Sequence, residues 1–462
     1  MSLKFLLSAA LIATLQAVLP AQAQVRLPSL PGLPGQPGGP HLPGDLLRRT
    51  ESLLTSTSQL LVPADPLRWR ERLGDQLLRR FPDQLQRNAA EELVFSGEVL
   101  ALPSSDAAKR RLLEDAGLTL VEVSTLEGLD LAWLRLRATS RMTPAALAAL
   151  IARLKADDPD GAYDYHHVYL DAGEVGATGP TGAIGTRAGS TSTAAGADAA
   201  GAAASAAGPR LGMIDSGVDT AHPALQRSTV TRRGCGGQAR PAAHGTAVAS
   251  LLVGDSDVGF RGALPRARLF AMDVYCEGGA QAGGGVAAIA EGLAWLARER
   301  VGVVNISLVG PPNALLRRVV EAAQAQGLLI VAPVGNDGPA APPLYPAAWP
   351  GVIGVTAVDA RRRVLVEAVR GAQVAFAAPG SDMVAAEAGS RVYAPVRGTS
   401  FASPLVAGML AARFPSADRA AASSAFNALA REAIDLGAPG RDEVYGIGLV
   451  GASLRVSASD LR

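Results

Sequence analysis

From residue 209 onward, short runs of apolar residues alternate with longer segments in which apolar residues recur at helical spacing. The apolar runs include residues 211–214, 301–306 and 328–334, and the helical spacing is clearest over residues 286–300. Short strands that are apolar throughout and alternate with helices are typical of a parallel sheet covered by helices on both faces. The pattern therefore predicts an α/β fold for residues 209–455.

Residues 93–171 show a different and more compact pattern. Strand-like and helix-like segments follow one another in the order β-α-β-β-α-β, and the second helix begins with Thr143-Pro144, a typical helix start. This order is that of a ferredoxin-like unit. We therefore expect a small α+β domain here, which on the pattern alone is a free-standing structural domain.

The segments between and before these two regions differ from both in composition. Residues 24–44 are rich in Pro and Gly and predict an extended linker. Residues 172–208 are mostly Ala, Gly, Ser and Thr, which predicts a flexible linker open to proteolysis. Residues 45–92 carry Leu at helical spacing with Arg and Asp on the other faces. They predict a helical segment that packs on a neighbour, with binding of the Arg-rich face to a membrane surface as the alternative.

Residues 1–23 have the parts of a secretory signal peptide. Lys4 supplies a positive charge, residues 5–18 form an apolar core, and residues 21–23 (Ala-Gln-Ala) fit a cleavage site with small residues. The alternative is a short membrane anchor, and no later apolar run is long enough to span a bilayer. We therefore expect a secreted or periplasmic protein.

The overall charge and the cysteines add two further constraints. The chain of 462 residues has 43 basic and 42 acidic residues, a balance that gives no indication of a nucleic-acid partner. The only cysteines are Cys235 and Cys276. In an exported chain they are a candidate disulfide, and two unpaired thiols are the alternative.

Four polar residues fall where the predicted strands and helices meet. Asp215 ends the first strand of the sheet, His244 opens a helix, and Asn336 follows a strand. Ser400 lies in a turn of small residues before an apolar helix, where a serine on its own fits an N-cap. Functional sites in parallel sheets form at the carboxyl ends of the strands, so we expect these side chains to meet there.

Together these four residue types supply what acyl transfer requires. Serine becomes a good nucleophile only when a base takes its proton, and histidine titrates near neutral pH. A carboxylate holds the imidazole in the correct tautomer and stabilises the imidazolium. An asparagine amide provides a hydrogen-bond donor for the oxyanion.

The sequence around these residues resembles the subtilisin-like serine peptidases, or subtilases. The motifs are DSGVDTAHP from Asp215, HGTAVAS from His244, GNDG around Asn336 and GTSFASP around Ser400. The resemblance covers about residues 210–451 and implies a subtilisin-like parallel sheet. It also implies that Asp215, His244 and Ser400 form a catalytic triad, with an oxyanion hole made by Asn336 and the Ser400 backbone N–H.

A further stretch resembles the family strand that pairs with the substrate backbone. The residues implied are Ser307, Leu308, Val309 and Gly310 on one wall of the pocket, and Val334 and Gly335 on the other. An extended peptide adding to such an edge gains main-chain hydrogen bonds with little demand on its sequence. Val309 stands where the family usually has Gly, which predicts a pocket restricted to small residues.

A second departure concerns metals. Many family members have Asp where this chain has Ala224, and that Asp serves a calcium site. The replacement removes a ligand, so structural calcium is possible but not supported by the sequence, and no cofactor is predicted.

The small domain at residues 93–171 is similar in position and element order to the propeptide of the family. The resemblance implies a folding assistant and intramolecular inhibitor whose C-terminal tail enters the active site until it is cleaved. The catalytic sheet begins almost directly after the 172–208 linker, whereas the family usually has an extra segment there. The position of the cleavage, and whether it occurs, stay open.

The sequence therefore predicts an exported serine endopeptidase that acts on protein or peptide substrates and is made as a zymogen. The alternative is a non-catalytic subtilase-like scaffold that binds peptides, with the small domain permanently docked. An esterase is disfavoured because Ser400 is not flanked by a Gly-x-Ser-x-Gly elbow.

Overall fold

The computed structural model describes residues 69–176, 208–234, 240–265, 267–275 and 284–461. The predicted signal peptide, the Pro/Gly-rich linker and both cysteines of the candidate disulfide lie outside these residues. Within them, no helix is long and apolar enough to cross a membrane.

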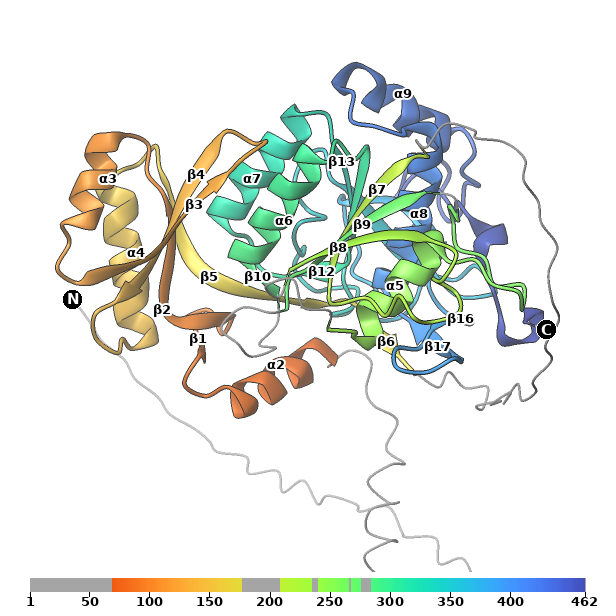
Figure 1. Cartoon of the computed structure of the whole chain (residues 1–462), viewed down its shortest axis with the longest axis horizontal. Helices are drawn as coiled ribbons and strands as arrows, with labels where there is room; N and C mark the ends of the chain where they lie inside the picture. The colour runs from red at the N-terminus through yellow and green to blue at the C-terminus, as the bar shows by residue number, and fades with distance from the viewer. Residues whose placement is uncertain (1–68, 177–207, 235–239, 266, 276–283, 462) are drawn as a thin grey trace, which may run out of the picture. The chain divides into compact units, whose positions relative to one another are not determined.

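The larger part of the described chain is built on a sheet of seven parallel strands (Figure 1). In spatial order the strands are β15 (Val374–Pro379), β14 (Ile353–Val358), β13 (Leu329–Pro333), β11 (Val303–Ile306), β7 (Arg210–Asp215), β9 (Arg268–Asp273) and β8 (Thr229–Arg233). The α/β fold class predicted from the pattern is confirmed.

Helices cover both faces of this sheet (Figure 1). On one face, α5 (Ala243–Val253) and α8 (Thr399–Arg413) share an apolar core with Met213 of β7. On the other face, α6 (Val286–Arg298) and α7 (Ala314–Ala325) share a second core with Ile214, the next residue of the same strand. Because successive side chains of a strand point to opposite faces, a strand covered on both sides must be apolar throughout.

The preceding domain is a four-stranded antiparallel sheet with two helices. Its elements are β2 (Leu93–Leu102), α3 (Asp106–Leu113), β3 (Leu118–Leu126), β4 (Leu131–Ala138), α4 (Pro144–Asp157) and β5 (Ala162–Asp171). The strands pair in the order β5-β2-β4-β3, and this is the ferredoxin-like arrangement expected from the element order. Ser105 and Thr143 cap the helices by accepting the backbone N–H three residues on.

The end of β5 continues into the larger part of the chain. Its last residues pair with two short strands, β10 (Gly284–Gly285) and β12 (Leu308–Val309). Beyond it, β6 (Glu174–Val175) pairs with β17 (Tyr393–Arg397), which in turn pairs with β16 (Met383–Ala386). The linker predicted to begin at Ala172 is therefore an ordered strand-like segment up to Gly176, because its backbone is hydrogen-bonded on both sides.

The helical segment predicted at residues 45–92 is only partly helical in its described portion. Helix α2 (Trp69–Arg80) ends before Pro82, and β1 (Leu85–Arg87) then pairs with β2. The prediction was wrong there because a strand partner, which the local leucine spacing does not reveal, decides the conformation. Helix α2 packs through Leu77 on a core with Leu170 of β5. After β17 the chain forms α8 and then α9 (Arg419–Ala430), and it ends in two short 3₁₀ turns, η4 (Ala452–Leu454) and η5 (Ala458–Asp460).

Candidate active site

Asp215 and His244 form a buried pair at the carboxyl edge of the parallel sheet. Asp215 is the last residue of β7, and His244 is the second residue of α5. The Nδ1 atom of His244 lies 2.9 and 3.1 Å from the two carboxylate oxygens of Asp215. The backbone N–H and the hydroxyl of Ser216 also donate to this carboxylate, at 2.7 and 3.1 Å. The imidazole is thus held in one orientation by a fixed acceptor.

Ser400 is the second residue of α8 and is completely buried. The preceding Gly398 has a φ of 140°, and a Cβ atom there would lie 2.5 Å from the Cα atom of Gly173. The turn therefore requires glycine for both its conformation and its closeness to the docked segment. The aromatic ring of Phe401 lies 5.1 Å from the His244 ring, which places the base beside the start of α8.

Two atoms needed for proton transfer are buried in this place. Among the described residues, neither the hydroxyl of Ser400 nor Nε2 of His244 has a hydrogen-bond partner. Buried polar atoms without a partner are costly in a folded protein and are characteristic of sites that perform chemistry. Asn336 and the backbone of Ser400 supply the next part of that site.

The carbonyl oxygen of Ala172 occupies the expected oxyanion hole. It accepts a hydrogen bond of 2.9 Å from the Ser400 backbone N–H and one of 2.5 Å from the side-chain amide of Asn336. The other end of that amide accepts from the backbone N–H and the hydroxyl of Thr399, at 3.2 and 3.0 Å. Thr399 thereby directs the N–H₂ group of Asn336 towards the carbonyl.

The segment around Ala172 runs through the site as an extended chain. Leu308 pairs with Asp171, and Val309 pairs with Leu170, in antiparallel register. On the other side of Ala172, Val175 pairs with Val396 of β17. A main chain that adds a strand to a sheet edge in this way is a typical mode of peptide binding.

The remaining predicted pocket residues have different surroundings. The side chain of Ser307 lies behind the site, where its hydroxyl donates to the Ser400 carbonyl at 3.2 Å. Gly310 faces the ring of Tyr169, and Val334 belongs to the same apolar core as Ala172 and Val309. The backbone N–H of Gly335 donates to the hydroxyl of Thr399, which in turn donates to Asn336. The restriction by Val309 to small residues stays a prediction, and the docked residue, Ala172, is small.

A second carboxylate, that of Asp171, approaches the imidazole. Asp171 Oδ1 lies 3.5 Å from Nδ1 of His244, and the hydroxyl of Tyr275 donates to the same carboxylate. Burial lowers the pKa of His244, but the charges of Asp171 and Asp215 outweigh burial and raise it overall. Burial raises the pKa of Asp171, although His244 opposes this effect.

The ligand atoms of Asp171, Asp215 and His244 lie within 4.8 Å of one another, a spacing that a metal ion also tolerates. In this protein His244 Nδ1 and the Asp215 carboxylate bond to each other. We therefore treat the three as a histidine with two carboxylates beside its Nδ1 atom and assign no metal ligands. Ala224, at the position expected for a calcium ligand, lies in the apolar core beside α5 and offers only a methyl group.

Sequence reasoning missed Asp171, Tyr275, Ser216 and Thr399. Ser216 and Thr399 adjoin predicted catalytic residues within the matched motifs, so the motifs were the available signal. Asp171 ends β5, and Tyr275 follows the end of β9 in a different sheet; nothing in their local sequence connects them with the site.

Comparison with known proteins gives three findings. The profile of the subtilase family matches residues 206–448. The chain is 31% identical over 209 residues to the minor extracellular protease Epr of Bacillus subtilis, across 45% of this chain and 32% of Epr. It is 32% identical over 250 residues to subtilisin DY of Bacillus licheniformis, across 52% of this chain and 88% of that protein.

Several of these relatives are longer than the region that the chain matches. The chain spans about a third of the length of Epr and about half the length of several other relatives that it matches. The crystal structure of fervidolysin from Fervidobacterium pennivorans, a keratinolytic enzyme related to subtilisin, aligns with a TM-score of 0.61. The alignment covers 78% of this chain and 61% of fervidolysin at 20% sequence identity, and so shows a shared fold.

Proposed function

Because the chain belongs to the subtilase family, we propose that it is a serine endopeptidase that hydrolyses peptide bonds through an acyl-enzyme intermediate. The observation that carries the proposal is the Ala172 carbonyl, which accepts hydrogen bonds from both Ser400 and Asn336 while the chain on either side is extended. A peptide bond held in this way presents its carbonyl carbon to the nucleophile.

Each group then has a defined task. The Ser400 hydroxyl oxygen bonds to the carbonyl carbon, and its proton passes to Nε2 of His244. Asp215 keeps the imidazole oriented and stabilises the imidazolium, while Asn336 and the Ser400 N–H stabilise the oxyanion. His244 returns the proton to the leaving nitrogen, and a water molecule hydrolyses the acyl-enzyme in the same two steps. The chain supplies every group, so the mechanism requires no cofactor.

The chain is made as a zymogen in this proposal, and its own N-terminal domain is the intramolecular inhibitor. The support is that β5 and β6 fill the positions of a peptide substrate on both sides of Ala172. The bond between Ala172 and Gly173 is then the one cut on activation, which lies at the first position of the predicted linker. A secreted or periplasmic location follows from the predicted signal peptide, and Epr, a relative, is called an extracellular protease.

The test is the intact mass of the full chain beside its Ser400→Ala variant. We expect the wild type to yield a product that begins at Gly173, while Ser400→Ala keeps the small domain covalently attached and loses all turnover of peptides. The same long mass for both, with no labelling of the wild type by a fluorophosphonate probe, would instead support the peptide-binding scaffold.

A further inference from the structure

We propose that a carboxylate directly before the residue at the cut bond slows cleavage by acting on His244, so that Asp171 keeps the intact chain latent. The site would discriminate substrates by charge at this position. The inference rests on the proposed peptidase function and adds to it a substrate preference and a cause of slow self-cleavage.

The position of Asp171 is fixed by its backbone and its side chain together. Its backbone pairs with Leu308, one residue before the carbonyl in the oxyanion hole. Its carboxylate accepts from the hydroxyl of Tyr275 and lies 3.5 Å from Nδ1 of His244. Any substrate bound in the same register presents its corresponding side chain to the same two groups.

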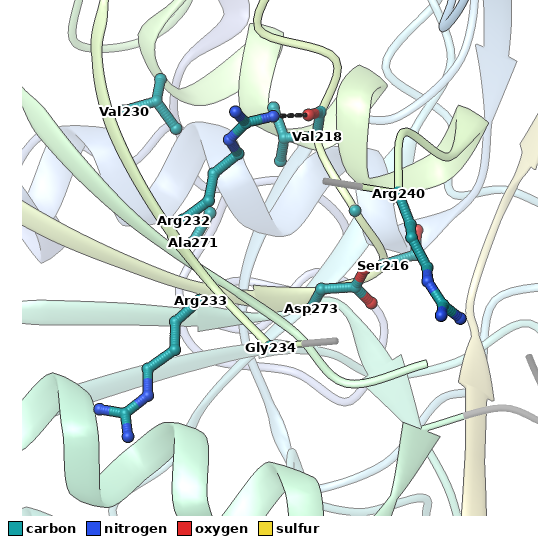
Figure 2. Close-up of a pocket in the computed structure, with 10 residues that line it drawn as sticks. Ser216, Val218, Val230, Arg232, Arg233, Gly234, Arg240, Ala271 and Asp273 are labelled. Carbon is teal, nitrogen blue, oxygen red and sulfur yellow. Dashed lines mark hydrogen bonds between the residues drawn. The ribbon is translucent and has the colours of Figure 1, made fainter. Parts of the chain in front are cut away.

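The described residues around Asp171 include groups of both charges. The cavity that Asp171 lines, about 490 Å³ in volume, also contains Arg80 of α2, Glu174 of β6, Arg240 before α5, His244 of α5, Asp273 of β9 and Tyr275 just after β9. Asp215 of β7 lies 2.9 Å from the same Nδ1 atom of His244 that Asp171 approaches. Asp273 and Arg240 also line the adjoining pocket next to Ser216, shown in Figure 2. Burial raises the pKa of Asp273 to about 6, so its charge is partly lost below neutral pH.

A second carboxylate beside His244 has opposite effects on the cleavage rate at pH values below and above the pKa of the imidazole. Below that pKa, His244 is already protonated and cannot accept the proton of Ser400. Above it, the base is neutral, and an extra negative charge assists formation of the imidazolium. Asp171 therefore slows cleavage only at pH values below the pKa of the imidazole. This effect weakens again at low pH, where Asp171 itself becomes protonated.

The first experiment compares two internally quenched peptides with the sequence of residues 168–175. One keeps Asp at the position of Asp171, and the other has Asn there. The enzyme is obtained by expressing the full chain, and kcat and KM are measured from pH 5 to pH 10. We expect kcat for the Asp peptide to be on the order of tenfold lower at pH 7. This corresponds to a shift of about one pKa unit in the acid limb, the part of the pH profile where kcat rises as His244 loses its proton. At alkaline pH the difference should reverse, because the extra negative charge there assists formation of the imidazolium.

A ratio of the two kcat values that does not change with pH would overturn the proposal, because a purely steric role acts equally at every pH. If neither peptide is cleaved, the peptidase function itself fails, which is a different result. Tyr275→Phe distinguishes binding of the Asp side chain from the effect of its charge on His244. It removes the hydroxyl but leaves both carboxylates. KM for the Asp peptide should therefore rise, while the acid limb of its pH profile stays at higher pH than that of the Asn peptide.

The second experiment places the same change in the full chain. Unfolded Asp171→Asn, Asp160→Asn and wild-type chains are diluted into refolding buffer, and the loss of intact mass is followed over time. Asp171→Asn should cut itself faster at neutral pH, and the rise of its cleavage rate with pH should begin at lower pH. Asp160→Asn removes a carboxylate from an exposed turn of the small domain before β5 and should follow the wild type. Equal displacement by both variants would assign the effect to total charge and contradict a specific role for Asp171.

Discussion

The side-chain amide of Asn336 is held in one orientation by the hydrogen bonds that its oxygen accepts. Thr399 provides two hydrogen bonds to that oxygen, and the N–H₂ group is left directed at the Ala172 carbonyl. A donor that is fixed before the reaction needs no reorganisation as the oxyanion forms. At the scale of the residue, the site therefore depends on hydrogen bonds made by neighbours that do not touch the substrate themselves.

The first prediction concerns this amide. Asn336→Ala removes one of the two oxyanion donors and should lower kcat by about 100- to 1,000-fold, with little change in KM. The effect is measured by steady-state hydrolysis of a peptide that has Ala directly before the cut bond. Titration of active sites with a fluorophosphonate controls for the fraction of folded enzyme. A loss of less than about tenfold would show that Asn336 does not stabilise the transition state.

At the scale of the element, helix α2, which precedes the ferredoxin-like unit, links the small domain to the larger part of the chain. Arg70 donates through Nε to both carboxylate oxygens of Asp337, at 3.0 and 2.8 Å, and through a second nitrogen to one of them. Asp337 directly follows Asn336, the proposed oxyanion donor. Since α2 also packs through Leu77 beside β5, it connects the small domain with the loop that carries Asn336.

This connection predicts how tightly the small domain stays bound after cleavage. The pair is partly exposed, with side chains 29% and 20% accessible, so its loss should weaken binding only a few-fold. Arg70→Ala should therefore shorten the lag before activity appears in a refolding time course by roughly twofold to fivefold. Arg79→Ala removes the same charge from an exposed position of the same helix and should leave the lag unchanged. The same shortening in both variants would mean that net charge, and not the Asp337 contact, controls release.

At the scale of the whole molecule, the small domain has its own acid-sensitive pair. Glu98 accepts from Arg137 at 2.5 Å and lies 2.7 Å from Nδ1 of His166 on the neighbouring strand. Burial raises the pKa of Glu98, but the hydrogen bonds of His166 and Arg137 and the charges of His166 and Arg135 outweigh burial and lower the pKa from 4.5 to about 2. His166 also accepts from the backbone N–H of Ala287 at 3.4 Å, so the pair lies where the small domain meets α6.

This shift sets the direction of a pH effect on folding. A carboxyl whose pKa is lower when folded contributes stability that is complete above its unfolded pKa of 4.5 and is lost as the pH falls towards 2. In the Ser400→Ala chain, the protection of β2 and β5 against hydrogen exchange, relative to the intrinsic exchange rate at each pH, should therefore fall across this range. Glu98→Gln should be less stable near neutral pH and should lose much of this dependence. An unchanged dependence in Glu98→Gln would assign the effect to other carboxyl groups.

The fold and the four candidate site residues were largely accessible from sequence because both depend on local pattern. Apolar runs separated by helical spacing indicate a parallel sheet. Two of the motifs follow strands of that sheet and two open helices, which is where sites form in such folds. The end of α2 and the strand β1 were mistaken because a tertiary partner overrode the leucine spacing. The beginning of the linker was misplaced for the same reason: Ala and Gly are typical of flexible segments, yet residues 172–176 are ordered by neighbours far away in the chain.

The sequence by itself determined the two sheets, the order of their elements, and the side chains Asp215, His244, Asn336 and Ser400. Only the tertiary structure decided which bond lies in the oxyanion hole and which carboxylate lies beside the imidazole. Ala172 and Asp171 are brought there by antiparallel pairing with β12, a strand more than a hundred residues later. Such pairing is made by main-chain groups that every residue carries, so the side chains of the segment do not indicate which strand it pairs with.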